Sequence, residues 1–216
     1  GRNIRKWYYN ESDENLLFLP WHFPLHEDME LKGASEKAES LLKEDFPAIY
    51  QHLLIHKEAL LDRNQEETGK RYEWYALQRC AASYYPEFEK NEKVIWGLTA
   101  NNWAFAYDDK QHYLPSNGYI LTSTDIPIRY LLGWLNSKLM HHYFHYIGGM
   151  TAGGAYTLKA ATISALPFKI PEEYMAIEEK VDAILLVKNK DKQADTTALE
   201  NQIDFLVYHL YGLTYD

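Results

Sequence analysis

The stretch SNGYILTSTDIPIRYLLGWLNSKLMHHYFHYIGG, residues 116–149, combines a turn, a strand and a long helix. Asn117-Gly118 is typical of a tight turn, and residues 119–123 after it predict a strand. Asp125 and Pro127 can then open a helix. Its apolar side chains recur at helical spacing, at residues 128, 132, 135, 139, 143 and 146. The two glycines that follow predict its end, so this stretch indicates a fold that mixes strands and helices.

Further strands are expected on the N-terminal side of this stretch. Residues 93–99 are apolar and β-branched, which predicts a buried strand, and residues 103–108 alternate as a half-buried strand does. Residues 1–9 also predict a strand, with a basic start.

Helices are expected between these strands. Helical spacing and Pro47 in a first turn predict a firm helix over 46–61. Ser35 can cap a short acidic helix before it, and a short helix is expected over 73–79 after it.

The tail predicts two amphipathic helices joined by a polar loop, which is typical of an antiparallel hairpin. The expected fold class is therefore α+β, with a twisted, mainly antiparallel or mixed sheet and packed helices, followed by a C-terminal helical hairpin. We expect two domains, one over 1–170 and the hairpin over 171–216.

Composition limits the classes of function. The 216 residues are 46% hydrophobic, enough for a real core, and no apolar run reaches the length of a membrane span. The single cysteine, Cys80, excludes an internal disulfide and fits a reducing cytoplasm. The net charge of −9 opposes simple nucleic-acid binding, so any such face must be local. The start GRNIRKWYY has no initiator Met and no apolar signal core, which predicts a fragment of a longer protein.

Seven segments, in this order, resemble the TaqI-like C-terminal specificity domain family. They are GRNIRKWYY (1–9), FPAIYQHLLIHKEALLDR (46–63), GKRYEWYALQR (69–79), KVIWGLT (93–99), SNGYILTS with YLLGWLNSKLMHHYF (116–144), GGAYTLKAATISALPFKIP (153–171) and ALENQIDFLVYHLYGLT (198–214). Such domains follow the catalytic core of adenine-N6 methyltransferases in type II and type IIG restriction–modification enzymes and in related phage-defence methylases.

The resemblance implies a domain that recognises double-stranded DNA and carries no chemistry. The family's catalytic core needs an Asn/Asp-Pro-Pro-Tyr motif, and this chain contains no Pro-Pro pair, no Gly-x-Gly-x-x-Gly and no Walker loop. The resemblance therefore places S-adenosylmethionine in an N-terminal methyltransferase domain of the same chain, outside this sequence.

Two loops carry the candidate DNA contacts. In the first, Gly153 and Gly154 allow close backbone approach, and Tyr156 and Lys159 follow them. The alternative interpretation is that this loop is a flexible surface turn without a role in binding.

In the second loop, Arg63 and Arg71 can read guanine and Lys70 can contact phosphate, unless Glu66 and Glu67 neutralise them.

Other polar residues favour structural readings. Asn136 and Ser137 sit in the middle of the expected helix and are expected to pack through hydrogen bonds, the alternative being a phosphate contact assisted by Lys138. His141 and His145 have metal-ligand spacing, but no acidic third ligand stands nearby in sequence, which argues against zinc and a hydrolase. A module that docks a methyltransferase or nuclease without reading bases remains the main alternative function.

Overall fold

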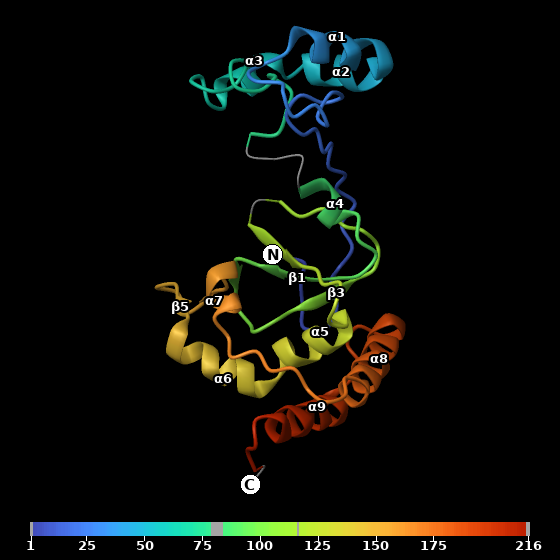
Figure 1. The fold of residues 1–216 in the computed structure, drawn as a ribbon, viewed down its shortest axis with the longest axis vertical. Helices are drawn as coiled ribbons and strands as arrows, with labels where there is room; N and C mark the ends of the chain where they lie inside the picture. The colour runs from blue at the N-terminus through green and yellow to red at the C-terminus, as the bar shows by residue number, and fades with distance from the viewer. Residues whose placement is uncertain (1, 79–83, 116, 215–216) are drawn as a thin grey trace. The chain divides into compact units, whose positions relative to one another are not determined.

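The computed structural model describes residues 2–78, 84–115 and 117–214. The chain divides into two compact units, one of residues 14–87 and the other of residues 1–13 with 88–216 (Figure 1). Cys80 lies outside the described residues.

The unit of residues 14–87 is built from short helices and loops. Its helices are α1 (Glu36–Asp45), α2 (Pro47–Leu54) and α3 (Lys57–Asp62), and α4 (Tyr85–Phe88) spans the boundary between the units. Ser35 caps α1 as expected, since its Oγ accepts the Ala38 N–H at 3.2 Å. The helix expected over 46–61 is instead two helices, because the chain turns at residues 55–56.

The helix expected over 73–79 is wrong for residues 73–78, which form turns. The reason is tertiary: the buried carboxylate of Glu73 accepts the backbone N–H groups of His22 at 2.7 Å and Ser35 at 2.8 Å. These bonds tie residue 73 to two loops that are distant in the sequence. The next residues, Trp74 and Tyr75, are buried in the small core of this unit.

The other unit contains two antiparallel sheets, which confirm the expected α+β class. In the first, β1 (Lys93–Gly97) lies between β3 (Ala106–Asp108) and β4 (Gly118–Leu121). In the second, β6 (Tyr156–Thr157) lies between β2 (Thr99–Ala100) and β5 (Gly149–Met150).

The strand expected over 1–9 is wrong for residues 2–9, because these residues form a tight turn. Trp7 has φ 77°, and isolated bridges join Ile4 to Tyr9 and Trp7 to Ala106 of β3. The buried Trp7 ring joins the main core, which fixes this turn to the sheet.

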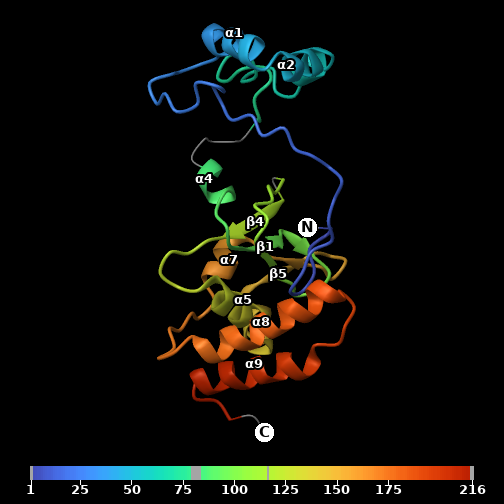
Figure 2. The same ribbon diagram turned by 90° about the vertical axis from the view of Figure 1, so that its right-hand side faces the viewer.

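Helices cover the first sheet in two layers. Figures 1 and 2 both show α5 (Ile128–Asn136) between the sheet and the hairpin of α8 (Met175–Lys190) and α9 (Thr197–Leu210). Gly133 makes this packing close, because a Cβ there would lie 2.7 Å from the Ile177 side chain. The hairpin prediction is confirmed. The hairpin belongs to the same compact unit as the sheets, and a functional boundary at residue 170 stays a prediction.

The long helix predicted over the opening stretch is two helices, α5 and α6 (Lys138–Ile147). Ser137 separates them with extended backbone (ψ 151°), and its Oγ caps α6. The short α7 (Ala160–Ser164) then precedes LPFKIP, residues 166–171. This sequence predicts a short strand ended by Pro171, but these residues form none.

Candidate nucleic-acid interface

The break at Ser137 is where the helix layer is joined to the strand segment before β3. Asn136 is 2% exposed; its Oδ1 accepts the Phe105 N–H at 3.1 Å, and its Nδ2 donates to the Phe105 carbonyl at 2.9 Å. Trp103 adds a bond from Nε1 to the Leu135 carbonyl at 2.6 Å. The amide of Asn136 thus pairs with both backbone groups of Phe105, as a residue of a neighbouring antiparallel strand would, which is the structural role expected of it.

The glycine-rich loop forms a hairpin between β5 and β6. Residues 151–155 make its tip, in which the Thr151 N–H donates to the Ala155 carbonyl at 2.8 Å. The backbone at residue 154 has a φ of +80°, which favours glycine because a side chain would strain this conformation. Gly153 and Gly154 are both exposed, and a Cβ at Gly154 would meet nothing within 4 Å. The tip therefore presents bare backbone to solvent.

Tyr156 lies at the base of this hairpin and is held by the helix beneath it. Its hydroxyl and His141 Nε2 are 2.9 Å apart, and its ring packs edge-on against His141 and Phe144. Burial, followed by the nearby charge of His145, lowers the pKa of His141. Tyr156 thus supports the hairpin through contacts that occupy its hydroxyl.

Lys159 follows the hairpin directly and precedes the first turn of α7. Its side chain is exposed and makes no hydrogen bond or ion pair with any residue of 2–78, 84–115 or 117–214. Its charge is therefore available to an anion outside the chain.

Lys138 has a different environment. Its Nζ lies 3.2 Å from Asp204 Oδ2 and donates to Asn201 Oδ1 at 2.8 Å, and its backbone N–H donates to Asp204 Oδ1 at 2.7 Å. These contacts join the start of α6 to α9, so the buried Asp204 compensates the charge of Lys138.

The three basic residues of the other loop, of which Arg63 and Arg71 were expected to read guanine and Lys70 to contact phosphate, lie in the unit of residues 14–87. Arg63 donates to the carbonyls of Leu60, Trp74 and Ala76, each at 2.9 Å, and burial lowers its pKa. Its guanidinium is thus used to join α3 to the buried turn at 74–76. We read this as a structural anchor, as we do Lys138.

Lys70 and Arg71 remain at the surface. Lys70 Nζ donates to the Gln65 carbonyl at 3.0 Å. Arg71 pairs with Glu67 at 3.0 Å, as the alternative reading of this loop expected, and its guanidinium lies over the Trp21 ring. Its side chain is still 60% exposed. N–H donors of the Arg71 guanidinium therefore remain accessible to solvent.

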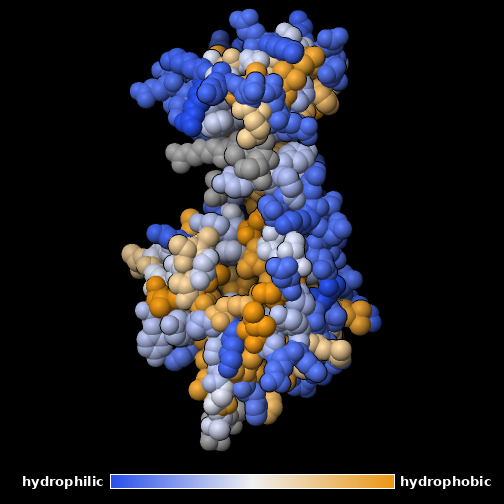
Figure 3. Space-filling model, viewed as in Figure 1, coloured by the Kyte–Doolittle hydropathy of each residue, from blue (hydrophilic) through white to orange (hydrophobic). Residues whose placement is uncertain are grey.

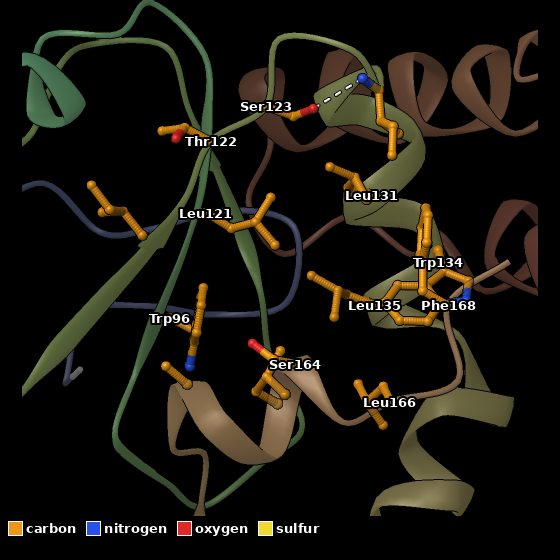
Figure 4. Close-up of a pocket in the computed structure, with 14 residues that line it drawn as sticks. Trp96, Leu121, Thr122, Ser123, Leu131, Trp134, Leu135, Ser164, Leu166 and Phe168 are labelled. Carbon is orange, nitrogen blue, oxygen red and sulfur yellow. Dashed lines mark hydrogen bonds between the residues drawn. The ribbon is translucent and has the colours of Figure 1, made fainter. Parts of the chain in front are cut away.

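An apolar pocket of about 500 Å³ lies between the first sheet and α5. Figure 3 shows hydrophobic residues gathered here, and Figure 4 shows Trp96 and Leu121 of the sheet across from Leu131 and Leu135 of α5. Among the described residues that line it, none carries an ionisable side chain. The hydroxyl groups in the lining, those of Thr122, Ser123 and Ser164, therefore have no acid or base beside them among the lining residues.

Comparison with known proteins gives the family. Residues 51–168, more than half of the chain, match the family described as the TaqI-like C-terminal specificity domain. The chain belongs to this family. It is also 30% identical over 181 residues to the type II methyltransferase M.MjaIV of Methanocaldococcus jannaschii, an alignment covering 79% of this chain and 57% of the relative. This specificity domain thus spans less than two thirds of that relative's length.

The matched region of the specificity domain runs from α2 to Phe168 and contains all eight candidate DNA-contacting residues.

Within the described part of the chain, no three His, Cys, Asp or Glu side chains are grouped to hold a metal ion. No helix of the described residues is both long and apolar enough to cross a membrane.

Proposed function

We propose that this specificity domain recognises a short double-stranded DNA site for an adenine-N6 methyltransferase of a type II or type IIG restriction–modification system. The catalytic domain precedes it in the same chain and binds S-adenosylmethionine. Similarity to a type II methyltransferase, over 57% of that protein, supports this arrangement. As part of the same proposal, the enzyme works in the cytoplasm and serves phage defence.

The observation that carries the proposal is the hairpin of β5 and β6 with Lys159 beside it. Its tip carries two exposed glycines, so backbone N–H and C=O groups can approach a ligand closely. Lys159 adds a positive charge that no described residue compensates. A protruding tip with an adjacent free cation is suited to a DNA groove lined by phosphates.

The candidate residues then divide by what they contact. Lys159 and the exposed face of Arg71 are available to DNA, whereas Arg63 and Lys138 are anchored within the fold. Tyr156 acts indirectly by holding the hairpin. We expect substitutions at the first two positions to change DNA affinity without unfolding the domain.

The test selects bound sequences from a library of random duplexes with the 216-residue chain at low salt. We expect one short motif to be enriched, and Lys159→Ala to weaken binding of that duplex. The matched control is Lys37→Ala, which removes an equally exposed lysine from α1. A library without any enriched motif would overturn base reading and favour the docking function.

A further inference from the structure

A second hollow, of about 720 Å³, lies in the unit that carries the sheets and has polar walls. We call it the N-terminal cleft. Its lining comes from the turn at residues 2–8, from residues 99–104, and from Asn117, Lys188 and Glu200.

Positive charge is concentrated in the N-terminal cleft. Four of its lining residues are basic and one is acidic: Arg2, Arg5, Lys6 and Lys188, with Glu200. Glu200 pairs with Lys6 at 2.5 Å, so these two charges offset each other. Three positive charges then remain in one hollow of a chain whose net charge is −9.

The remaining cations are not paired with carboxylates within the described ranges. Arg2 is exposed and makes no hydrogen bond there through its side chain. Arg5 is exposed and donates only to backbone carbonyls, those of Arg2 at 2.7 Å and Ile4 at 2.9 Å. Lys188 donates to the carbonyls of Ala194 at 2.8 Å and Lys192 at 3.4 Å, and it makes no ion pair, although the nearby carboxylate of Asp195 offsets part of its charge.

Neutral donors line the same hollow. Asn101, Asn102 and Asn117 are exposed, and their side-chain amides bond to none of the residues described. Trp7 is 2% exposed, and its buried indole N–H lies beside the Glu200 carboxylate without reaching good hydrogen-bond geometry, so it is not counted among the free donors. Both oxygens of Glu200 are meanwhile bonded to Lys6 and Thr196. Charged and neutral donors converging on one hollow suit the oxygens of a phosphate.

The pairing register places this cleft at the hairpin's end of the second sheet. Ala100 of β2 and Met150 of β5 both pair with Tyr156 of β6. Beyond that row, β2 continues into Asn101 and Asn102, while β5 and β6 continue into the hairpin tip. The polar rim of the cleft and the exposed glycines therefore leave the sheet in the same direction.

The support beneath them is shared as well. Trp103, which lines the cleft, stacks on His141 with ring centroids 5.4 Å apart, and His141 contacts the Tyr156 hydroxyl. One row of rings thus holds both the cleft wall and the base of the hairpin.

We infer that the N-terminal cleft binds the sugar–phosphate backbone of duplex DNA beside the bases approached by the hairpin. This inference rests on the proposed function and adds a contact that supplies affinity without sequence choice. The guanidinium groups of Arg2 and Arg5 bind phosphate oxygens, and the asparagine amides add hydrogen bonds. Glu200 holds Lys6 against the cleft wall.

The test compares the wild-type chain with Arg2→Ala, Arg5→Gln and Arg5→Lys on the selected duplex and on a scrambled duplex. One phosphate contact contributes about 0.9 to the slope of log affinity against log salt, which corresponds to about eightfold between about 0.1 and 1 M salt. We expect each neutral variant to lose roughly that much affinity at low salt for both duplexes, with the selected motif unchanged. Arg5→Lys keeps the positive charge and should therefore keep part of the affinity that Arg5→Gln loses. Lys190→Ala, two residues from Lys188 on α8, is the control and should bind like wild type.

A second measurement locates the contact on DNA. Duplexes in which one phosphate at a time is a neutral methylphosphonate should bind wild type weakly at one or two positions. Arg5→Gln should be insensitive at those positions, because the interaction it would lose is already absent. Circular dichroism and melting temperatures confirm that the variants are folded.

The outcomes separate this inference from the proposed function. If no motif is enriched, the proposed function fails. If a motif is enriched but the arginine variants bind both duplexes like wild type, only the cleft assignment fails. A changed motif in Arg5→Gln would overturn the backbone role by showing that Arg5 reads bases. Inorganic phosphate, added at constant ionic strength, should not displace the duplex; arginine-dependent displacement would assign the cleft to small free anions.

Discussion

Asn136 offers the sharpest test of how the helix layer is held to the strand segment before β3. Asn136→Ala removes both bonds to Phe105, whose N–H has no other hydrogen-bond acceptor in the described chain. The Phe105 carbonyl keeps a second bond, from the Trp7 N–H at 2.9 Å. The substitution thus leaves one buried donor unsatisfied and removes one further bond.

The magnitude follows from those two losses. A buried unsatisfied N–H costs about 1–3 kcal/mol, and a lost hydrogen bond whose acceptor keeps another partner costs about 1 kcal/mol. We therefore expect Asn136→Ala to lower the free energy of unfolding by about 2–4 kcal/mol. Asn136→Asp has nearly the same volume, but it turns an oxygen towards the Phe105 carbonyl and should be at least as destabilising at pH 7.

The assay is urea unfolding followed by tryptophan fluorescence and far-ultraviolet circular dichroism at pH 7. Asn102→Ala is the control: this asparagine is exposed, and its amide bonds to none of the residues described, so its unfolding midpoint should not move. A change below about 0.5 kcal/mol for Asn136→Ala, a size usual for surface substitutions, would refute the peptide-pairing argument. An Asp variant as stable as wild type would show that packing volume, not hydrogen bonding, sets the requirement.

Three further predictions concern stability. Burial, with His145 next, lowers the pKa of His141, so below about pH 6.5 the unfolded chain binds the proton more readily. Urea titrations should show wild type losing stability from about pH 7 to pH 5, and His141→Gln should lose less, by at most about 1.4 kcal/mol per pH unit; equal slopes would contradict this. Gly154→Ala should cost about 1 kcal/mol because φ is +80°, whereas Gly153→Ala, whose Cβ would meet only Thr151 Oγ1 at 3.9 Å, should melt like wild type. Asp108→Asn leaves the fully buried Lys93 without its counter-charge at 3.2 Å and should cost about 3–5 kcal/mol in urea unfolding; a cost below 1 would exclude a structural pair.

The sequence predicts those elements whose pattern is local. The buried strand predicted over 93–99 is confirmed for 93–97, where every residue is buried. The hairpin of α8 and α9 is confirmed as well, because apolar spacing sets the buried face of each helix. Periodicity continues across Ser137, yet the helix breaks there, since Asn136 bonds to a peptide 31 residues away. Glu73 shows the same limit: its partners at 22 and 35 lie far away in sequence and hold residues 73–76 out of a helix.

Prediction of the site from the sequence has the same limit: contacts between residues distant in the sequence cannot be recognised. Lysine and arginine near a glycine-rich loop can be recognised as candidates, and Lys159 does remain free of described partners. That Arg63 would be occupied by carbonyls at 60, 74 and 76 could not be foreseen, because those acceptors converge only in three dimensions. The N-terminal cleft unites residues up to almost 200 positions apart and has no contiguous signature.

The distribution of charge decides how an acidic chain can serve DNA recognition. Lys6, Arg71 and Lys138 each pair with a carboxylate, so these cations add little to long-range attraction. Contacts to DNA phosphates supply affinity that does not depend on the DNA sequence, whereas contacts to base edges supply sequence specificity. In the proposed function, a chain of net charge −9 is held weakly by DNA of any sequence. Binding then depends on a site where hairpin and cleft engage together, which favours discrimination over tight non-specific binding.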